Sequence, residues 1–229
     1  MLSIIVPTYN ERGNILHLIA LLEAVVENAH EIIVVDDNSP DGTADAVLKA
    51  SKKFPSVKLL KREGKMGLSS AIMAGVSAAK GEYVVVMDAD LSHPPELVPK
   101  MAVALKGCDL VIGSRMLPGG GVKSWPLHRR LISSGAELLA RLAVGVKVSD
   151  PLSGFFAMRQ DAFAATRVRT KGYKILLNIL ADNRQLKIRE IPYLFQDRAA
   201  GETKLGAGEV AQYLADLFTL RFRRPSAKP

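Results

Sequence analysis

The chain has 229 residues, 48% of them hydrophobic, and a formal net charge of +8. The length is sufficient for one α/β domain with a full hydrophobic core, and the hydrophobic fraction excludes a disordered chain. The positive charge favours an anionic partner. The single cysteine, Cys108, excludes an internal disulfide and a cysteine-based zinc cluster.

The first half alternates short apolar runs with helical periodicity. The pattern predicts strands at 3–6, 32–35, 57–60, 83–87 and 110–112, and helices at 15–26, 43–53, about 68–79 and 94–105. Successive β-α units imply an α/β fold with a mainly parallel sheet, in which ligands bind at the carboxyl ends of the strands.

The second half is less regular. It predicts strands at 153–159 and 188–195, and helices at 131–146, 175–183 and about 209–222. The last helix is amphipathic and basic residues follow it, which fits a helix at a membrane interface and fits packing onto the core equally well. Three glycines at 119–121 predict a mobile, lid-like loop after Arg115.

Polar residues fall at the predicted carboxyl ends of the strands. Asp88 and Asp90 stand at i and i+2 at the end of a strand and would point the same way, which suits Mg²⁺ or Mn²⁺ bound to a diphosphate. The alternative for this pair is a helix cap or a solvated turn. Ser92 is either a weak metal ligand or the cap of the following helix, and we favour the cap. His93 is either a ligand or a structural hydrogen-bonding residue.

The Asp36–Asp37 pair and Lys65 each have two interpretations. Asp36 and Asp37 would accept hydrogen bonds from a nucleoside, or form an Asx turn ahead of Pro40. Lys65, beside Gly64 in a glycine-flanked loop, would approach a phosphate or lie in solvent. The sequence contains neither G-x-G-x-x-G after the first strand nor G-x-x-x-x-G-K-[ST], which argues against a dehydrogenase and a P-loop ATPase.

Cations in loops or at element ends form the second group of candidates. Arginine forks recognise phosphate oxygens, although each such residue is also explained as a solvated surface charge. These residues are Arg115, Arg129, Arg130, Arg198 and Lys204. A basic nucleic-acid-binding protein is the alternative of a different class, but aromatic residues make up only 6% and form no basic-aromatic pattern.

Six segments in order resemble the family 2 glycosyltransferases of GT-A fold, a Rossmann-like α/β fold, over nearly the whole chain. Three of them narrow the resemblance to the dolichol-phosphate mannose synthases within that family. The general segments are 6–11, 35–43 and 88–93, and the narrowing segments are 113–115, 149–155 and 197–205.

The resemblance implies a role for each matching residue. The nucleoside would be held by Pro7, Tyr9, Glu11, Val35 and Asp37. The diphosphate would be held by Asp88, Ala89 and Asp90. The metal, Mg²⁺ or Mn²⁺, would be bound by Asp90, with Asp88 and Ser92, although some relatives have Gln at the Ser92 position. The acceptor phosphate would be bound by Arg115, Arg129 and Lys204. Lys65, Arg115, Arg198 and Lys204 would also contact the nucleotide-sugar, and Asp90, Arg115, Arg129 and Arg198 would be the catalytic residues.

The implied reaction is inverting, metal-dependent transfer of mannose from GDP-mannose to dolichol or polyprenyl phosphate. Glucose transfer from UDP-glucose is the alternative. Asp150 would orient an arginine or serve as a base, and we favour the first. The chain would be one catalytic domain, with a nucleotide-binding half at about 1–112, an acceptor-binding half at about 113–207 and a membrane-facing helix at about 208–223.

The location follows from the same features. No apolar run reaches the roughly 18–20 residues that cross a bilayer, and the first residues lack the basic flank of a signal peptide. We expect a cytoplasmic protein, peripheral on the cytosolic face of a membrane. Members of the family often carry C-terminal membrane spans. Three possibilities therefore stay open: the protein binds a membrane-anchoring subunit, it resembles the members without spans, or the chain is shortened.

Overall fold

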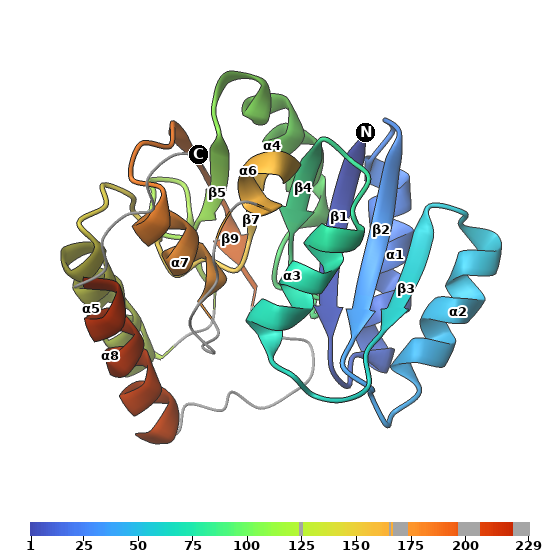
Figure 1. The fold of residues 1–229 in the computed structure, drawn as a ribbon, viewed down its shortest axis with the longest axis horizontal. Helices are drawn as coiled ribbons and strands as arrows, with labels where there is room; N and C mark the ends of the chain where they lie inside the picture. Colours follow the sequence, from blue (N-terminus) through green and yellow to red (C-terminus); the bar gives the residue numbers. More distant parts are fainter. Residues whose placement is uncertain (124–125, 165, 167–173, 197–206, 222–229) are drawn as a thin grey trace.

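The computed structural model describes residues 1–123, 126–164, 166, 174–196 and 207–221. Its centre is a seven-stranded sheet in the order β3-β2-β1-β4-β7-β5-β8, covered by helices on both faces (Figure 1). The strands are β1 Leu2–Thr8, β2 His30–Asp36, β3 Val57–Lys61, β4 Tyr83–Val86, β5 Leu110–Ser114, β7 Phe156–Arg159 and β8 Ile188–Pro192.

Strand direction brings most strand ends to one edge of the sheet. β7 is antiparallel to β4 and to β5, and every other neighbouring pair is parallel. The remaining six strands therefore point the same way. β1 lies between β2 and β4, so the loops that leave these three strands are neighbours at the carboxyl edge.

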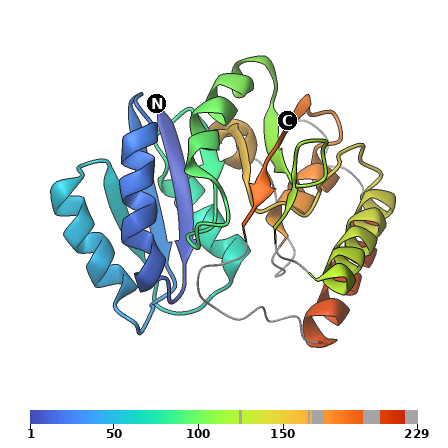
Figure 2. The ribbon, with the colours of Figure 1, turned by 180° about the vertical axis from the view of Figure 1, so that it is seen from behind.

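The helices divide between the two faces of the sheet. α1, α2 and α4 pack on one face, and α3, α5, α7 and α8 pack on the other (Figures 1 and 2). Their bounds are α1 Arg12–Val25, α2 Thr43–Lys53, α3 Leu68–Ala78, α4 Val98–Ala104, α5 Leu127–Val144, α6 Gln160–Ala164, α7 Ile175–Asp182 and α8 Ala207–Arg221. Short 3₁₀ turns at Pro95–Leu97 and Leu105–Gly107 flank α4.

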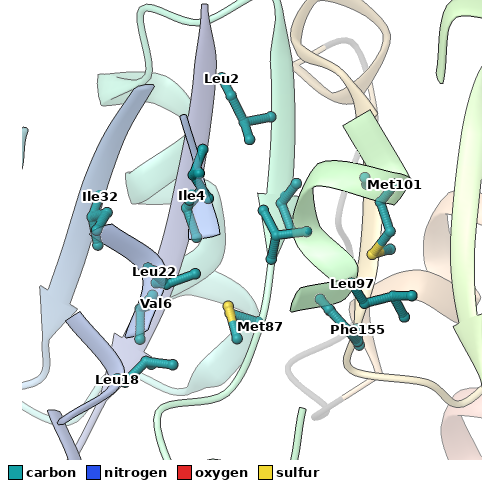
Figure 3. Close-up of a cluster of buried hydrophobic side chains, with 14 of the residues drawn as sticks. Leu2, Ile4, Val6, Leu18, Leu22, Ile32, Met87, Leu97, Met101 and Phe155 are labelled. Atoms are coloured by element: carbon teal, nitrogen blue, oxygen red, sulfur yellow. The ribbon is translucent and has the colours of Figure 1, made fainter. Parts of the chain in front are cut away.

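Two hydrophobic clusters hold these layers together. β1 is buried over its whole length, and successive residues face opposite sides, so Ile4 belongs to one cluster and Ile5 to the other. In the first cluster, Leu18 and Leu22 of α1 lie beside the sheet, and Met101 of α4 lies farther along it (Figure 3). Burial on both faces explains why the strands are continuous apolar runs without alternation.

The structure confirms most predicted elements and corrects four details. The strand expected at 153–159 begins at Phe156 and runs antiparallel. The strand expected at 188–195 is two strands, β8 and β9 (Leu194–Phe195), and β9 pairs with β6 (Gly121–Val122). The glycine segment expected as a mobile loop is therefore tied down at its end, where Gly121 N–H donates to the Tyr193 carbonyl at 3.1 Å. The short helix α6 was not predicted.

Among the described residues, no helix has both the length and the hydrophobicity to cross a bilayer.

Candidate active site

The ends of β1 and β2 form the first part of the site. The backbone N–H of Asp37 donates to the Thr8 carbonyl at 3.1 Å, which joins the two strand ends. The Nζ of Lys65 lies 4.3 Å from the centre of the Tyr9 ring, a cation–π contact. The structure thus brings Tyr9, Asp37 and the Lys65 loop to one place, as the strand-end rule predicted.

The other residues expected at the nucleoside lie in the same strands or directly after them. Pro7 and Val35 are buried in β1 and β2. Glu11 precedes α1, and its carboxylate accepts a hydrogen bond from the Asn14 amide at 2.9 Å. Contacts of Pro7, Val35 and Glu11 with a nucleoside stay a prediction.

Asp36 and Asp37 have different surroundings. Asp36 accepts hydrogen bonds from the Thr8 hydroxyl at 3.0 Å and from the Ser39 N–H at 2.9 Å, so Asp36 forms the turn. Asp37 accepts the Met66 N–H at 3.1 Å, and its Oδ1 lies 3.1 Å from Nε of Arg62. The turn interpretation is therefore correct for Asp36, and the contact of Asp37 with a nucleoside stays a prediction.

Asp88 and Asp90 follow β4 rather than lying on it. β4 ends at Val86, so the expectation that the two carboxylates share one face of a strand was wrong. They lie instead in a bend that includes Leu91 at φ 64°. The side chain of Asp88 is 35% exposed, whereas Asp90 is 3% exposed.

The backbone at this edge adopts positive φ angles after three neighbouring strands. Asn10, Asn38 and Leu91 have φ of 62°, 56° and 64°, and they follow β1, β2 and β4. A left-handed Leu is uncommon because its Cβ crowds the following carbonyl. Such strain is concentrated at functional sites, where the surrounding structure holds it in place.

Ser92 and His93 support the Asp88–Asp90 bend. The Ser92 N–H and hydroxyl both donate to Oδ1 of Asp90, at 3.1 and 2.5 Å. The expectation that Ser92 caps the next helix was wrong, since that turn begins after Pro94 and has no side-chain cap. Nδ1 of His93 accepts the Asp88 N–H at 3.0 Å, and burial lowers the pKa of His93. His93 is therefore a structural residue that fixes the bend as a neutral imidazole.

Arg115 and Asp150 form a bidentate pair at the end of β5. Nε and Nη2 of Arg115 each donate to Asp150 at 2.7 Å, and the Arg115 backbone N–H donates to the same carboxylate at 3.1 Å. Asp150 is completely buried, and Glu190 accepts its backbone N–H at 3.1 Å. Burial alone would lower the pKa of Arg115, but the Asp150 carboxylate raises it. Asp150 thus orients Arg115, as the sequence indicated.

Further ionisable groups lie around this pair. Oε1 of Glu137, from α5, is 3.6 Å from Nη2 of Arg115. Burial, together with the charge of Asp150, raises the pKa of Glu137 to about 7. Burial and the charge of Arg115 lower the pKa of Lys174, whereas burial raises that of Tyr193. The site is therefore a dense group of charges in a medium of low dielectric constant.

An aromatic cluster joins the Asp88–Asp90 bend to Arg115. The His93 ring stacks on Phe155 at 4.9 Å and meets Phe195 edge-on at 6.2 Å. The Phe195 ring lies 5.8 Å from the Arg115 guanidinium carbon. A side chain at Gly154 would lie 3.5 Å from Oδ2 of Asp88, so the loop that carries Asp150 also runs against that carboxylate. The structure thus brings the Asp88–Asp90 bend and the Arg115–Asp150 pair close together.

The four other predicted cations have a different status. Arg129 is on α5, eight residues before Glu137, and is half-buried. The backbone of Arg130 is in the same helix. Arg198 and Lys204 lie outside the described residues, so their assignment to donor and acceptor phosphates stays a prediction.

The residues after β4 fit a divalent cation that a substrate helps to hold. Two carboxylates and a hydroxyl, from Asp88, Asp90 and Ser92, supply hard oxygen atoms. The described residues contain no cluster of three or more histidine, cysteine or acidic side chains suited to an ion. Mg²⁺ is commonly bound by one or two carboxylates together with substrate phosphates, so this small set is sufficient.

Comparison with known proteins decides the family. A model described as glycosyl transferase family 2 matches residues 3–167. The chain belongs to this family. A dolichol-phosphate mannosyltransferase of Pyrococcus furiosus is 43% identical over 222 residues, which cover 95% of this chain and 63% of that protein. One of Saccharomyces cerevisiae is 39% identical over 94% of this chain and 85% of that protein. An undecaprenyl-phosphate mannosyltransferase of Micrococcus luteus is 38% identical over 93% of this chain and 90% of that protein.

Solved structures confirm the GT-A fold of the family. Glucosyl-3-phosphoglycerate synthase of Mycobacterium tuberculosis, in complex with Mn²⁺, UDP-glucose and phosphoglyceric acid, has a TM-score of 0.74 at 23% identity. The match covers 99% of this chain and 81% of that one. The resemblance that the sequence motifs indicated is therefore correct in both family and fold.

Sequence reasoning missed four residues of the site: Arg62, Glu137, Lys174 and Tyr193. Arg62 directly follows β3, so the strand-end rule would have found it if applied to that strand. Glu137 is the only acidic residue of α5, which is a usable signal. Lys174 and Tyr193 carry no comparable signal, because a lysine before a helix and a tyrosine between two strands are common in any fold.

Proposed function

We propose that this family 2 glycosyltransferase moves a mannosyl group from GDP-mannose to a dolichol-type or other polyprenyl phosphate, with inversion at the anomeric carbon. The names of the relatives support the sugar and the lipid class, since they are mannosyltransferases acting on dolichol phosphate or undecaprenyl phosphate. The strand-end residues that match the family motifs support a nucleotide-sugar donor.

One observation carries the proposal. The loop of Asp150 and Gly154 lies against Asp88 on one side and holds Arg115 on the other. Carboxylates suited to a metal–diphosphate group therefore lie beside an oriented arginine suited to a second phosphate. A glycosyl transfer to a phosphate needs both, because the donor diphosphate and the acceptor phosphate are in the site together.

The protein's own contribution is mainly positioning. A lipid phosphate is already anionic at neutral pH, so it needs no strong base to attack the sugar. Arginine has five N–H bonds, and Asp150 accepts two of those on the Arg115 side chain, which leaves three directed elsewhere. Arg115, with Arg129 and Lys204, would hold the acceptor phosphate in line with the anomeric carbon. Arg198 and Lys65 would contact the donor phosphates.

Asp88 and Asp90, with Ser92, would hold the divalent cation. When bound, Mg²⁺ or Mn²⁺ would supply positive charge to the diphosphate that leaves. The hydrogen bond from the Ser92 hydroxyl holds the Asp90 carboxylate, and the bond from the Asp88 backbone N–H to His93 holds the backbone that carries Asp88. Preorganised groups of this kind need no rearrangement during the reaction.

Glucose transfer from UDP-glucose is the second candidate, because the neighbours with a matching fold bind UDP-glucose. A thermal-shift titration with GDP and UDP, each with Mn²⁺, separates the two. The proposal expects GDP to raise Tm more than UDP, and the reverse order would favour the UDP donor.

We further propose that α5 and α8 face the membrane that contains the acceptor, on its cytosolic side. Four α5 leucines at the spacing of one helix face are 50–72% exposed: Leu127, Leu131, Leu138 and Leu142. Leu214 and Phe218 of α8 are 50% and 69% exposed. The Tyr213 hydroxyl donates to the Ala136 carbonyl at 2.6 Å and ties α8 to α5, and the two helices lie side by side at one end of the molecule (Figures 1 and 2). A membrane-anchoring subunit would contact the same end.

The experiment is a transfer assay with a panel of labelled nucleotide-sugars and a polyprenyl phosphate, with added metal or with EDTA. We expect product from GDP-mannose with Mg²⁺ or Mn²⁺, and little with EDTA. Asp90→Asn should lower kcat/KM by at least about 100-fold, because it removes a charged ligand from the cation. Asp45→Asn, at an exposed position of α2, is the matched control. Activity of Asp90→Asn at the wild-type level would remove the proposed metal site.

A further inference from the structure

The guanidinium edge of Arg115 that faces away from Asp150, called the free edge below, is where an acceptor phosphate would bind. Asp150 accepts hydrogen bonds from Nε and from one hydrogen of Nη2. The second hydrogen of Nη2 and both hydrogens of Nη1 are then available for an anion on the opposite side. Glu137 lies next to this side, with Oε1 3.6 Å from Nη2.

Glu137 is an unusual residue for its position. It is 2% exposed, it faces inward from α5, and Ser133, one turn earlier, donates to its Oε1 at 3.0 Å. A distance of 3.6 Å is outside the usual range of a hydrogen bond, so Glu137 does not pair with Arg115 as closely as Asp150 does. A buried carboxylate that is only partly paired destabilises the folded state, so a functional role would explain why Glu137 is placed here.

The charges around Glu137 come from several elements. Arg115 and Asp150 face it from the loops after β5 and before β7, and Arg141 faces it from its own helix. Lys174 approaches from the residue before α7, and Tyr213 from α8. A phosphate that arrives at Arg115 adds one or two negative charges to this group. A second anion beside a carboxylate favours the protonated form of the carboxylate.

On the basis of the proposed function, we propose that Glu137 is a positioning residue of the acceptor site: it lies beside the free edge of Arg115 and takes up a proton from solvent when the acceptor phosphate binds there.

The consequence is a coupling between proton and acceptor. Glu137 already titrates near neutrality, because burial and Asp150 raise its pKa to about 7. Below this pH the carboxyl group is protonated and a phosphate meets no repulsion from it. Above this pH a proton must bind together with the phosphate, so the acceptor affinity falls by up to about tenfold for each pH unit. Donor affinity should be unaffected, since the donor would bind at the carboxylates after β4.

Steady-state kinetics with a short-chain prenyl phosphate test this coupling between pH 6 and 8.5. We expect wild type and Glu137→Gln to have an acceptor KM within about twofold of each other at pH 6. At pH 8.5 the acceptor KM of wild type should exceed that of the variant by about 10- to 30-fold, because the amide carries no charge at either pH. Values of kcat and of donor KM should stay similar. Glu27→Gln, an exposed residue beyond the end of α1, is the matched control. Parallel pH profiles for wild type and Glu137→Gln would overturn the inference.

Calorimetry on the wild type keeps the test independent of the variant's folding. Binding of the same prenyl phosphate without donor, at pH 8 in buffers of different ionisation enthalpy, should show uptake of close to one proton. No proton uptake would overturn the inference even if transfer is observed. Proton uptake without transfer from any nucleotide-sugar would instead overturn the proposed function and leave the role of Glu137 at a phosphate site intact.

Discussion

At the scale of single residues, each carboxylate in the site is distinguished by what donates to it. Asp36 is engaged by its own turn, and Asp150 is engaged by the guanidinium of Arg115. Asp88 keeps the most exposed side chain of the carboxylates after β4. Glu137 lies beside a cation without a close hydrogen bond to it. These differences separate the carboxylates with a structural role from those that we propose to act on a substrate or a proton.

Glu137 also makes stability depend on pH. Its pKa is raised from 4.5 to about 7 in the folded protein, so the folded state binds more protons than the unfolded state between these values. The free energy of unfolding therefore falls as pH rises through this window, by up to about 3 kcal/mol. In urea unfolding, Glu137→Gln should gain stability relative to wild type between pH 5 and pH 8.5. A difference that is the same at both pH values would contradict this assignment.

The residues at the strand ends could be predicted from the sequence because their position follows from the topology of the sheet. Asp37 follows β2, and Asp88 and Asp90 follow β4; both strands neighbour β1, so the position of these residues at one edge of the sheet could be predicted before any coordinates. The partners of Asp37 and Arg115 were harder to predict. Met66 donates through its backbone, and Glu137 reaches Arg115 from a helix 22 residues further along the chain, where no local pattern distinguishes an inward carboxylate from a solvated one.

At the scale of elements, long periodic segments could be predicted and short ones could not. α2 has its predicted bounds, 43–53, because its apolar spacing and its glycine-containing turn agree. β6 and β9 have two residues each, too few for any periodicity. The antiparallel direction of β7 was not predicted, because it depends on the long connection through α5 rather than on the strand's own residues.

The contact between α3 and the sheet gives a testable element-level prediction. A Cβ at Gly75 would lie 2.5 Å from Cγ2 of Ile5, a core residue, whereas a Cβ at Gly135 of α5 would meet nothing within 4 Å. Gly75→Ala should therefore destabilise the protein by about 1–3 kcal/mol through overpacking. Gly135→Ala should stabilise it by roughly 0.5–1 kcal/mol, because alanine loses less entropy in a helix. Thermal unfolding of both variants checks this, and an unchanged Tm for Gly75→Ala would refute the close packing.

At the scale of the whole molecule, the site and the exposed apolar side chains share one helix. α5 presents Glu137 inward and its leucines outward. α8 lies beside it, and β3 and α2, in the half of the chain proposed to bind the nucleotide, lie at the far end (Figure 1). A membrane at α5 and α8 would therefore present a lipid phosphate near Arg115 while the donor approaches the opposite half from solvent.

Vesicle binding tests this orientation. Replacing Leu131 and Leu142 together by Gln should reduce co-sedimentation with vesicles of phosphatidylcholine and phosphatidylglycerol by at least about tenfold, because each exposed leucine that enters the bilayer contributes more than about 1 kcal/mol. Leu48→Gln, on the exposed side of α2, is the control and should bind as wild type does. Equal loss in both variants would place the membrane elsewhere.

The central claim is that one site holds a metal-bound diphosphate and a lipid phosphate together. The most direct measurement compares transfer from GDP-mannose to a polyprenyl phosphate with transfer to the corresponding polyprenol, at saturating Mn²⁺, for wild type and Arg115→Lys. We predict product only with the phosphate, and an acceptor KM at least about tenfold higher for Arg115→Lys, since lysine cannot pair with Asp150 and reach a phosphate at the same time. Transfer to the alcohol at a comparable rate, or an unchanged acceptor KM, would contradict the account.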